Sequence, residues 1–544
     1  MKNVLPYLHH LSLTSILILS TVVLAVAILQ LVALTAGQRY YYKVFYLAAI
    51  QGGVYLFFAA LFRYSWQLHL GIFLLSATLT LIFLLASDRS FLRKRVKLDP
   101  TWSVKFPIHG SKPLIIQNIK RGMAIFGSAG SGKTESGFVP ILKHAGEKNI
   151  PCLCYDYKNG ELTEIARYFF QNSTVKQSVI IPHAPMYSDR VNPFHPKYIP
   201  TEQHLRQMTK LIFANLKKAG NVKDSGTNFF DKIPEPTLAA VIWRLKVDYP
   251  EMCTLPHAVA FCLVRPPAEI AKFISKNPYS LAIGAPLIDS LISENQVAGV
   301  KASLSLPLTD LALPSIFWVM SANEVDLDVN NPDNPTFLCI VNDPRIERAN
   351  APFISVIMAA AINSMQVRNR PGSFLLLDEG TTFFFDGISK IPATMRSYNI
   401  ATVFSTQDIA LSRENYGDLV TRSLFSNLSY QMIGKTNDPD SVKYYKNISE
   451  EIEKATVSKS YSSALMGGDT RTSEGTRETS KYKNQDFTGM KAGQFFMFAD
   501  GKDKLYNFGL FPFQRIENKV KHLITDREIN DNFNKIMEEV KSLE

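Results

Sequence analysis

The chain has 544 residues, with 59 basic and 48 acidic side chains and a formal charge of +11 at pH 7. This length exceeds what one hydrophobic core usually supports, so we expect at least two domains besides any membrane segment. The basic excess favours polyanionic partners, although basic flanks of membrane segments also contribute to it.

The first 98 residues are expected to form a transmembrane anchor of two or three helices. Residues 12–36 carry no charge over a run longer than the roughly 20 residues that cross about 30 Å of hydrocarbon. A cleaved signal peptide is the alternative, but its apolar core is usually about 7–15 residues long. Residues 44–61 and 70–87 are further candidate spans. The basic residues that follow place that end in the cytoplasm: Arg89, Arg93, Lys94, Arg95 and Lys97. Two crossings would leave the N-terminus inside and three would leave it outside.

A phosphate-binding loop is predicted from "FGSAGSGKTESG", residues 126–137, which follows a short apolar strand and matches G-x-x-x-x-G-K-[ST]. Such a loop turns backbone N–H groups toward phosphate oxygens, and the following helix N-terminus adds its positive end. Lys133 would reach the β and γ phosphates and Thr134 would hold magnesium. A glycine turn without a ligand is the alternative. The expected nucleotide-binding residues are Gly127, Ser128, Ala129, Gly130, Ser131, Gly132, Lys133, Thr134 and Glu135.

The five cysteines show no CxxC pair and no metal-ligand spacing, and all fall in or near apolar stretches: Cys152, Cys154, Cys253, Cys262 and Cys339. Free cysteine behaves as a small hydrophobic residue. We therefore expect five reduced core residues of a cytosolic domain.

Residues 201–313 are expected to form an all-α domain inserted between two parts of a nucleotide-binding domain, 99–200 and 314–520. In "TEQHLRQMTKLIFANLKK" the apolar residues Leu205, Met208, Ile212 and Leu216 recur at helical spacing. A helical bundle is also the simplest way to fill any insertion, so this periodicity alone indicates no substrate.

"FLLLDEG", residues 374–380, is the expected counterpart of the loop. Four apolar residues predict a buried strand that ends in two carboxylates. Asp378 would join the magnesium shell, and Glu379 would polarise the attacking water, because hydrolysis needs a metal anchor and a base near the γ phosphate.

Two further elements complete the chain. Residues 455–485 are rich in Ser, Thr, Gly and charge, and predict a mobile loop. Residues 521–544 predict one amphipathic C-terminal helix that starts near Thr525.

From about residue 115 to 510 the chain resembles the type IV coupling proteins. The similarity is carried by "LLLDEGTTFFFDGISKIPATMRSYNIATVFSTQDIALSRENYG" at 375–417, "GFVPIL" after the phosphate loop, "VNPF" at 191–194 and "GQFFMFADG". The resemblance implies an α/β fold, a P-loop NTPase of the RecA-like translocase type with an inserted all-α domain and an N-terminal transmembrane anchor. "YDYKNGE" at 155–161 departs from the family's D-P-K-G-E pattern, which leaves the roles of Asp156 and Lys158 open.

Carried over by position, the resemblance implies that Arg396 is an arginine finger for a neighbouring subunit and that Gln407 senses the γ phosphate. Without the resemblance, the sequence alone would favour a surface charge on a helix for Arg396 and a strand cap for Gln407. The resemblance also implies ATP and Mg²⁺ as cofactors, a homo-hexamer, and a bacterial inner-membrane location with the ATPase domains in the cytoplasm.

The implied function is ATP-dependent recruitment and translocation of DNA, bound without sequence preference and attached to its relaxase, or of effector protein to a type IV secretion channel. A nucleotide-gated receptor for protein effectors is the alternative from a different class. A chromosomal DNA translocase with the same motor is a third.

Overall fold

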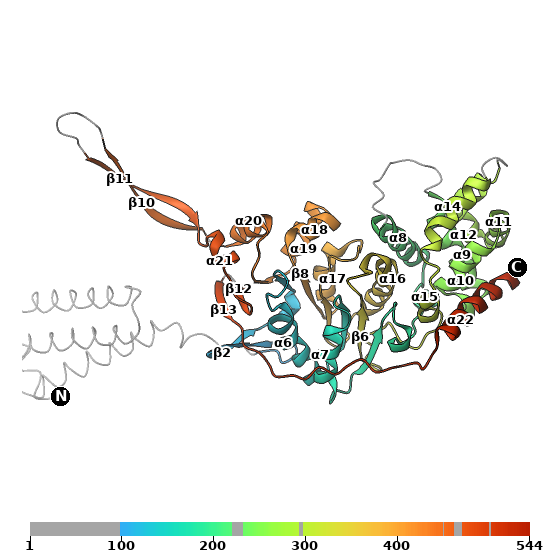
Figure 1. Cartoon of the computed structure of the whole chain (residues 1–544), viewed down its shortest axis with the longest axis horizontal. Helices are drawn as coiled ribbons and strands as arrows, with labels where there is room; N and C mark the ends of the chain where they lie inside the picture. Colours follow the sequence, from blue (N-terminus) through green and yellow to red (C-terminus); the bar gives the residue numbers. More distant parts are fainter. Residues whose placement is uncertain (1–97, 220–231, 293–296, 450, 462–469, 500–501) are drawn as a thin grey trace, which may run out of the picture. The chain divides into compact units, whose positions relative to one another are not determined.

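The computed structural model describes residues 98–219, 232–292, 297–449, 451–461, 470–499 and 502–544 (Figure 1). Leu98–Glu544 forms one compact unit. The expected anchor and its candidate spans at 12–36, 44–61 and 70–87 lie outside the described residues. Within the described part, no single helix is long and apolar enough to cross a membrane; α14 (Val297–Thr309) and α15 (Pro314–Met320), bent by 74° at their break, pass only as a pair and only by length and composition.

A nine-stranded sheet in the order β13-β12-β9-β3-β8-β7-β4-β6-β5 forms the centre of this unit. The seven strands from β9 to β5 run parallel, and β12 and β13 add an antiparallel edge. The strands are β3 (Met123–Phe126), β4 (Cys152–Asp156), β5 (Lys176–Ile180), β6 (Thr336–Val341), β7 (Ser373–Leu377), β8 (Ile400–Thr406), β9 (Tyr430–Ile433), β12 (Gln494–Ala499) and β13 (Lys502–Asn507). β1 (Val104–Ile108) and β2 (Ser111–Ile116) form a separate antiparallel pair.

Successive strand residues enter two different cores, because side chains alternate across a sheet. Ile125, Cys154 and Leu376 pack on one face with α6 (Val139–Glu147) and α7 (Glu161–Phe170). Phe126 and Tyr155 pack on the other face, with α16 (Glu347–Met365). Both faces are covered, which explains the near-continuous apolar runs of these strands. The five cysteines are buried and unpaired, as expected.

The helices that cover the second face after the acidic strand are α17 (Ile391–Ser397), α18 (Ile409–Tyr416), α19 (Asp418–Ser426) and α20 (Pro439–Ile448), and α21 (Asn484–Thr488) lies farther on. Short turns of helix join several elements: η1 (Ile119–Arg121), η3 (Pro185–Tyr187), η5 (Pro250–Met252), η7 (Ile388–Lys390) and η8 (Val540–Ser542).

Between β5 and β6 the regular elements among the described residues are all helices and short helical turns. The helices are α8 (Glu202–Ala219), α9 (Pro234–Asp248), α10 (Leu255–Val264), α11 (Pro267–Ser275), α12 (Pro278–Ile283), α13 (Ala285–Ser290), α14 and α15. In α8 the predicted period is confirmed, since Leu205, Met208 and Ile212 are fully buried. One of these helices, α15, lies after residue 313, which was the expected end of the inserted all-α domain. We call α8 to α15 the helical insert.

The segment expected to be a mobile loop, 455–485, contains most of a β-ladder instead. β10 (Glu451–Tyr461) pairs antiparallel with β11 (Thr470–Ser480), from Glu451 opposite Ser480 to Tyr461 opposite Thr470. The polar composition concealed the ladder, because the alternation of apolar and polar residues that predicts a strand is absent from this segment. The β-favouring signal available in the sequence is the enrichment of the second strand in threonine.

The C-terminal helix α22 (Asp526–Glu539) begins where it was predicted. Thr525 caps it, and Glu528 completes a capping box. The extended chain before it crosses the body of the unit, with Ile516 N–H donating to Glu164 O at 3.2 Å and Lys521 N–H to Met186 O at 2.8 Å. Figure 1 shows α22 beside α10 and α15 of the helical insert.

Candidate nucleotide site

The predicted phosphate loop connects β3 to a turn of π-helix, η2 (Thr134–Phe138), which continues into α6. Gly130 and Gly132 have φ of 74° and 88°, a left-handed backbone that side chains other than glycine rarely adopt. A Cβ on Gly127 would lie 2.5 Å from Ser131 Oγ. The glycines are therefore required by the turn itself, and the strand–loop–helix context expected from the sequence is present.

The loop and the twin acids meet at one edge of the sheet. β3, β8 and β7 are neighbours and parallel, so their carboxyl ends lie side by side. Lys133 Nζ lies 3.0 Å from Glu379 Oε1, and both side chains are buried, with 5% and 2% exposed. Lys133 Nζ also donates to Gly127 O at 2.5 Å. Two motifs distant in sequence thus form one site.

Ser405, in β8, makes hydrogen bonds with both Asp378 and Glu379. Its place in the site was not predicted from the sequence. Its hydroxyl donates to Asp378 Oδ1 at 2.8 Å and accepts from Glu379 N–H at 3.1 Å. The available signal was a serine near the end of the predicted strand "ATVFST", two residues before Gln407. This bridge fixes the carboxylate of Asp378 and the backbone of Glu379 relative to each other.

Burial sets the acidity of the two carboxyl groups. It raises the pKa of Asp378, against the opposing positive charges of Lys158 and Lys133. It also raises the pKa of Glu379, against the opposing charge of Lys133. A carboxylate with a raised pKa is a stronger base, which suits a group that accepts a proton from water.

Asp156 lies at the end of β4, the neighbour of β7, and is fully buried. It accepts hydrogen bonds from Thr163 N–H at 2.9 Å and Thr163 Oγ1 at 3.0 Å. Burial raises the pKa of Asp156 to about 7. The extra residue Asn159 and the following Gly160 both have positive φ, 52° and 101°, which turns the chain from β4 into α7. Asp156 therefore supports this turn beside the acidic pair.

Gln407 lies beside the phosphate loop, as its expected role requires. It follows β8 and lines a cavity of about 870 Å³ together with Ser128, Ala129, Gly130, Ser131, Lys435, Asn437, Gly489, Met490, Lys491 and Ala492. Arg396 lies in α17 and is exposed to solvent. The role toward a neighbouring subunit that the resemblance implies for Arg396 stays a prediction.

The residues present suit a nucleotide with magnesium better than a protein-only metal site. Ser131 Oγ and Ser136 Oγ are buried beside the loop without a hydrogen-bond partner. Across the described chain, no group of three or more His, Cys, Asp or Glu side chains could hold a metal ion. Mg²⁺ is usually bound by one or two protein oxygens together with phosphate, and Thr134 and Asp378 can supply that number.

Comparison with known proteins supports this description. Residues 373–488 match the model of a family described as the TraM recognition site of TraD and TraG. Conjugative coupling protein TrwBdeltaN70, in its unbound monoclinic form, shares the fold with a TM-score of 0.56 at 13% identity, over 78% of this chain and 91% of that chain.

Plasmid coupling protein TrwB in complex with the non-hydrolysable ATP analogue ADPNP gives a TM-score of 0.54 at 12% identity, over 73% of this chain and 87% of that one. TrwB in complex with ADP and Mg²⁺ gives the same score and identity, over 73% and 88%. No curated protein sequence matches the chain. The P-loop NTPase fold and the resemblance to type IV coupling proteins, both predicted from the sequence, are confirmed.

Proposed function

We propose that this chain is a membrane-anchored ATP hydrolase that recruits and translocates substrate for a conjugative or related type IV secretion channel. The contact that carries the proposal is the 3.0 Å pair between Lys133 and Glu379, because it joins the phosphate loop to the acidic strand end in one buried site. The solved TrwB complexes contain an ATP analogue or ADP with Mg²⁺, which supports ATP and Mg²⁺ as the cofactors here.

Each side chain of the site has a role in this reaction. The backbone of the loop holds the phosphates, and Lys133 moves from Glu379 to the β and γ phosphates. Thr134 and Asp378 would hold a magnesium ion, which would supply positive charge against the phosphoryl oxygens. Glu379 then orients water and accepts its proton. Gln407 contacts the γ phosphate. Ser405 keeps the carboxylate of Asp378 and the backbone of Glu379 in fixed relative positions.

Arg396 completes the site of the next subunit in a homo-hexamer. A cation supplied across an interface makes hydrolysis depend on assembly. We place residues 1–98 in the bacterial inner membrane as a multi-pass anchor, with 99–200 and 314–520 as the cytoplasmic nucleotide-binding domain and 201–313 as the inserted domain. DNA with its relaxase, or an effector protein, is the cargo, and channel components are the partners.

The family described as a TraM recognition site also supports a protein partner from a transfer system, contacted by residues 373–488. A protein partner is also expected under the alternative function, in which the nucleotide state gates the docking of protein substrates and no DNA is pumped. DNA-stimulated turnover separates the two functions. A pump is stimulated by DNA, with a strong dependence on salt because backbone phosphates dominate the contact; DNA without effect on turnover favours the receptor.

The test uses the full-length chain. Lys133→Ala should abolish ATP hydrolysis and substrate transfer between cells while the protein still inserts in the membrane. Lys143→Ala is the matched control, because Lys143 lies ten residues farther along, on α6, where it pairs with Glu147 and lies 5.4 Å from the centre of the Phe511 ring. Normal transfer by the Lys133 variant would contradict the proposed function.

A further inference from the structure

The four residues after Gly380, Thr381–Phe384, are held by side chains from other elements. The Tyr416 hydroxyl donates to Phe383 O at 2.6 Å, and Asn415 Nδ2 donates to Thr381 O. We call Thr381–Phe384 the acid loop, because it begins two residues after Glu379. Tyr416 and Asn415 belong to α18, so the loop is tied to the sheet's own helices on that side.

The helical insert holds the other end of the acid loop from α8, where Lys218 Nζ lies 4.6 Å from the centre of the Phe384 ring and Asn215 makes the hydrogen bonds. Asn215 Nδ2 donates to Phe384 O at 2.9 Å, and its Oδ1 accepts from Phe384 N–H at 2.8 Å. Asn215 is itself 2% exposed, and its Nδ2 is also shared with Leu211 O at 2.9 Å. A paired contact of this kind fixes both position and orientation of the Phe384 backbone.

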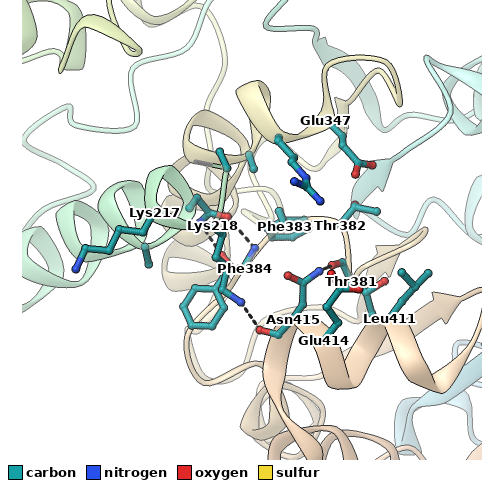
Figure 2. Close-up of a pocket in the computed structure, with 15 residues that line it drawn as sticks. Lys217, Lys218, Glu347, Thr381, Thr382, Phe383, Phe384, Leu411, Glu414 and Asn415 are labelled. Atoms are coloured by element: carbon teal, nitrogen blue, oxygen red, sulfur yellow. Dashed lines mark hydrogen bonds between the residues drawn. The ribbon is translucent and has the colours of Figure 1, made fainter. Parts of the chain in front are cut away.

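A cavity of about 690 Å³ borders the acid loop (Figure 2). It lies between α8, the start of α16 and α18, and Figure 2 shows Lys217, Glu347 and Glu414 around its rim. Close packing normally fixes a loop, but an open side leaves room for displacement. Hydrogen bonds such as those of Asn215 therefore determine where this loop lies.

Glu379 depends on that loop for its conformation. Its φ is 47°, in the left-handed region that costs a residue with a side chain about 1–3 kcal/mol and persists only when the surroundings enforce it. The carbonyl oxygen of Glu379 accepts from Thr382 N–H at 3.0 Å and from Thr382 Oγ1 at 2.8 Å. Thr382 Oγ1 lies 2.7 Å from the Tyr155 hydroxyl. Phe384 is thus two residues from Thr382, whose hydrogen bonds hold Glu379 in its strained conformation. A movement at Phe384 occurs close to those hydrogen bonds.

We propose that Asn215 is a positioning residue through which the helical insert sets the orientation of Glu379. The inference rests on the proposed function, since it assigns the control of the same acid. A displacement of α8 moves Phe384 through the paired contact, the acid loop shifts toward the cavity, and Glu379 leaves its productive orientation. A substrate bound to the insert can in this way change the rate of hydrolysis without touching the nucleotide.

The test measures kcat and KM of the full-length chain with Asn215→Ala and Asn215→Asp. We expect kcat to fall by about 10²-fold, the loss typical of a small misplacement of a catalytic group, with KM for ATP unchanged. Asn363→Ala is the matched control: Asn363, in α16, also makes a hydrogen bond with α8, to Gln207 Oε1 at 3.2 Å, but it has no hydrogen bond to the acid loop. Its kcat should be unchanged.

Two readouts separate positioning from a general loss of structure. In a Glu379→Gln background, Asn215→Ala should cause no further loss of kcat, because the acid through which it acts is already absent. Asn215→Asp keeps a donor to Phe384 O only while its carboxyl is protonated, so its kcat relative to the original chain should fall as the pH rises through the pKa of that carboxyl. This variant decides the question if Asn215→Ala does not fold.

An unchanged kcat in the Asn215 variants, or an equal loss in the Glu379→Gln background, would overturn the inference. Neither result affects the proposed function, which is tested separately through Lys133→Ala and the response of turnover to DNA.

Discussion

Replacing Lys133 by methionine should destabilise the fold, independently of any effect on nucleotide. The change leaves the 2%-exposed carboxyl of Glu379 without the cation that lies 3.0 Å away. Removing one partner of a buried ion pair typically costs about 3–5 kcal/mol. The unit from Leu98 to Glu544 has roughly 450 residues, and an unfolding entropy of about 2.1 cal/mol/K per residue converts this loss to a melting temperature about 3–5 °C lower.

The loss should grow with pH. Burial raises the pKa of Glu379 in the folded chain, and Lys133 opposes that rise, so the variant has a still higher folded pKa. A folded pKa above the unfolded value gives stability that is present below the unfolded pKa and lost as the pH rises through the folded one. The deficit of Lys133→Met is therefore small near pH 5 and largest near pH 8.

Thermal unfolding of the detergent-purified full-length chain, without nucleotide, measures this difference at both pH values. Nucleotide is left out because ligand binding would stabilise the original chain alone. The double variant Lys133→Met/Glu379→Gln removes the orphaned charge and should recover most of the melting temperature. Lys143→Met, at an exposed ion pair, should change it little. Equal melting of the single variant and the original chain at pH 8, or no recovery in the double variant, would refute the reasoning.

Three further predictions concern the acids and the arginine. Glu379→Gln should lower turnover by about 10²–10⁴-fold while equilibrium binding of ATP with Mg²⁺ is retained, and normal turnover would contradict the role of Glu379 as base. Mixing Arg396→Ala subunits into original subunits should reduce ATPase activity non-linearly, because each arginine serves a neighbour; a strictly linear loss counts against a shared site. Burial raises the pKa of Asp156 to about 7, so about 4 kcal/mol of stability should be lost as the pH rises from about 4 through 7. Asp156→Asn should flatten that slope in a series of melting curves, and an unaltered slope would mean that another group titrates.

Local chemistry explains what the sequence could predict of the site. Gly130 and Gly132 were recognisable because only glycine suits their backbone angles, and Asp378 because a carboxylate directly after four apolar residues marks a strand end. Which strands are neighbours depends on pairing across hundreds of residues, and no local pattern encodes it. Ser405 and Asn215 were missed for this reason, since each is defined by what it contacts after the sheet has formed.

The pairing of β10 with β11 was not predicted from the sequence for a different reason. Apolar periodicity identifies elements that bury a face, and β10 with β11 forms a ladder outside the central sheet. Backbone pairing alone defines this element, and composition contains little information about it.

The order of the strands gives the helical insert two kinds of attachment to the motor. It leaves the sheet after β5 and returns at β6, which are adjacent strands at one edge, so the insertion interrupts no pairing. These covalent connections alone would leave Glu379 unaffected, because β4 separates β6 from β7. The contact of Asn215 with Phe384 is made in the acid loop, which follows β7 and Glu379. A rotation of the insert about its covalent connections must therefore move the acid loop or break that contact, and in either case the geometry of Glu379 responds to the insert.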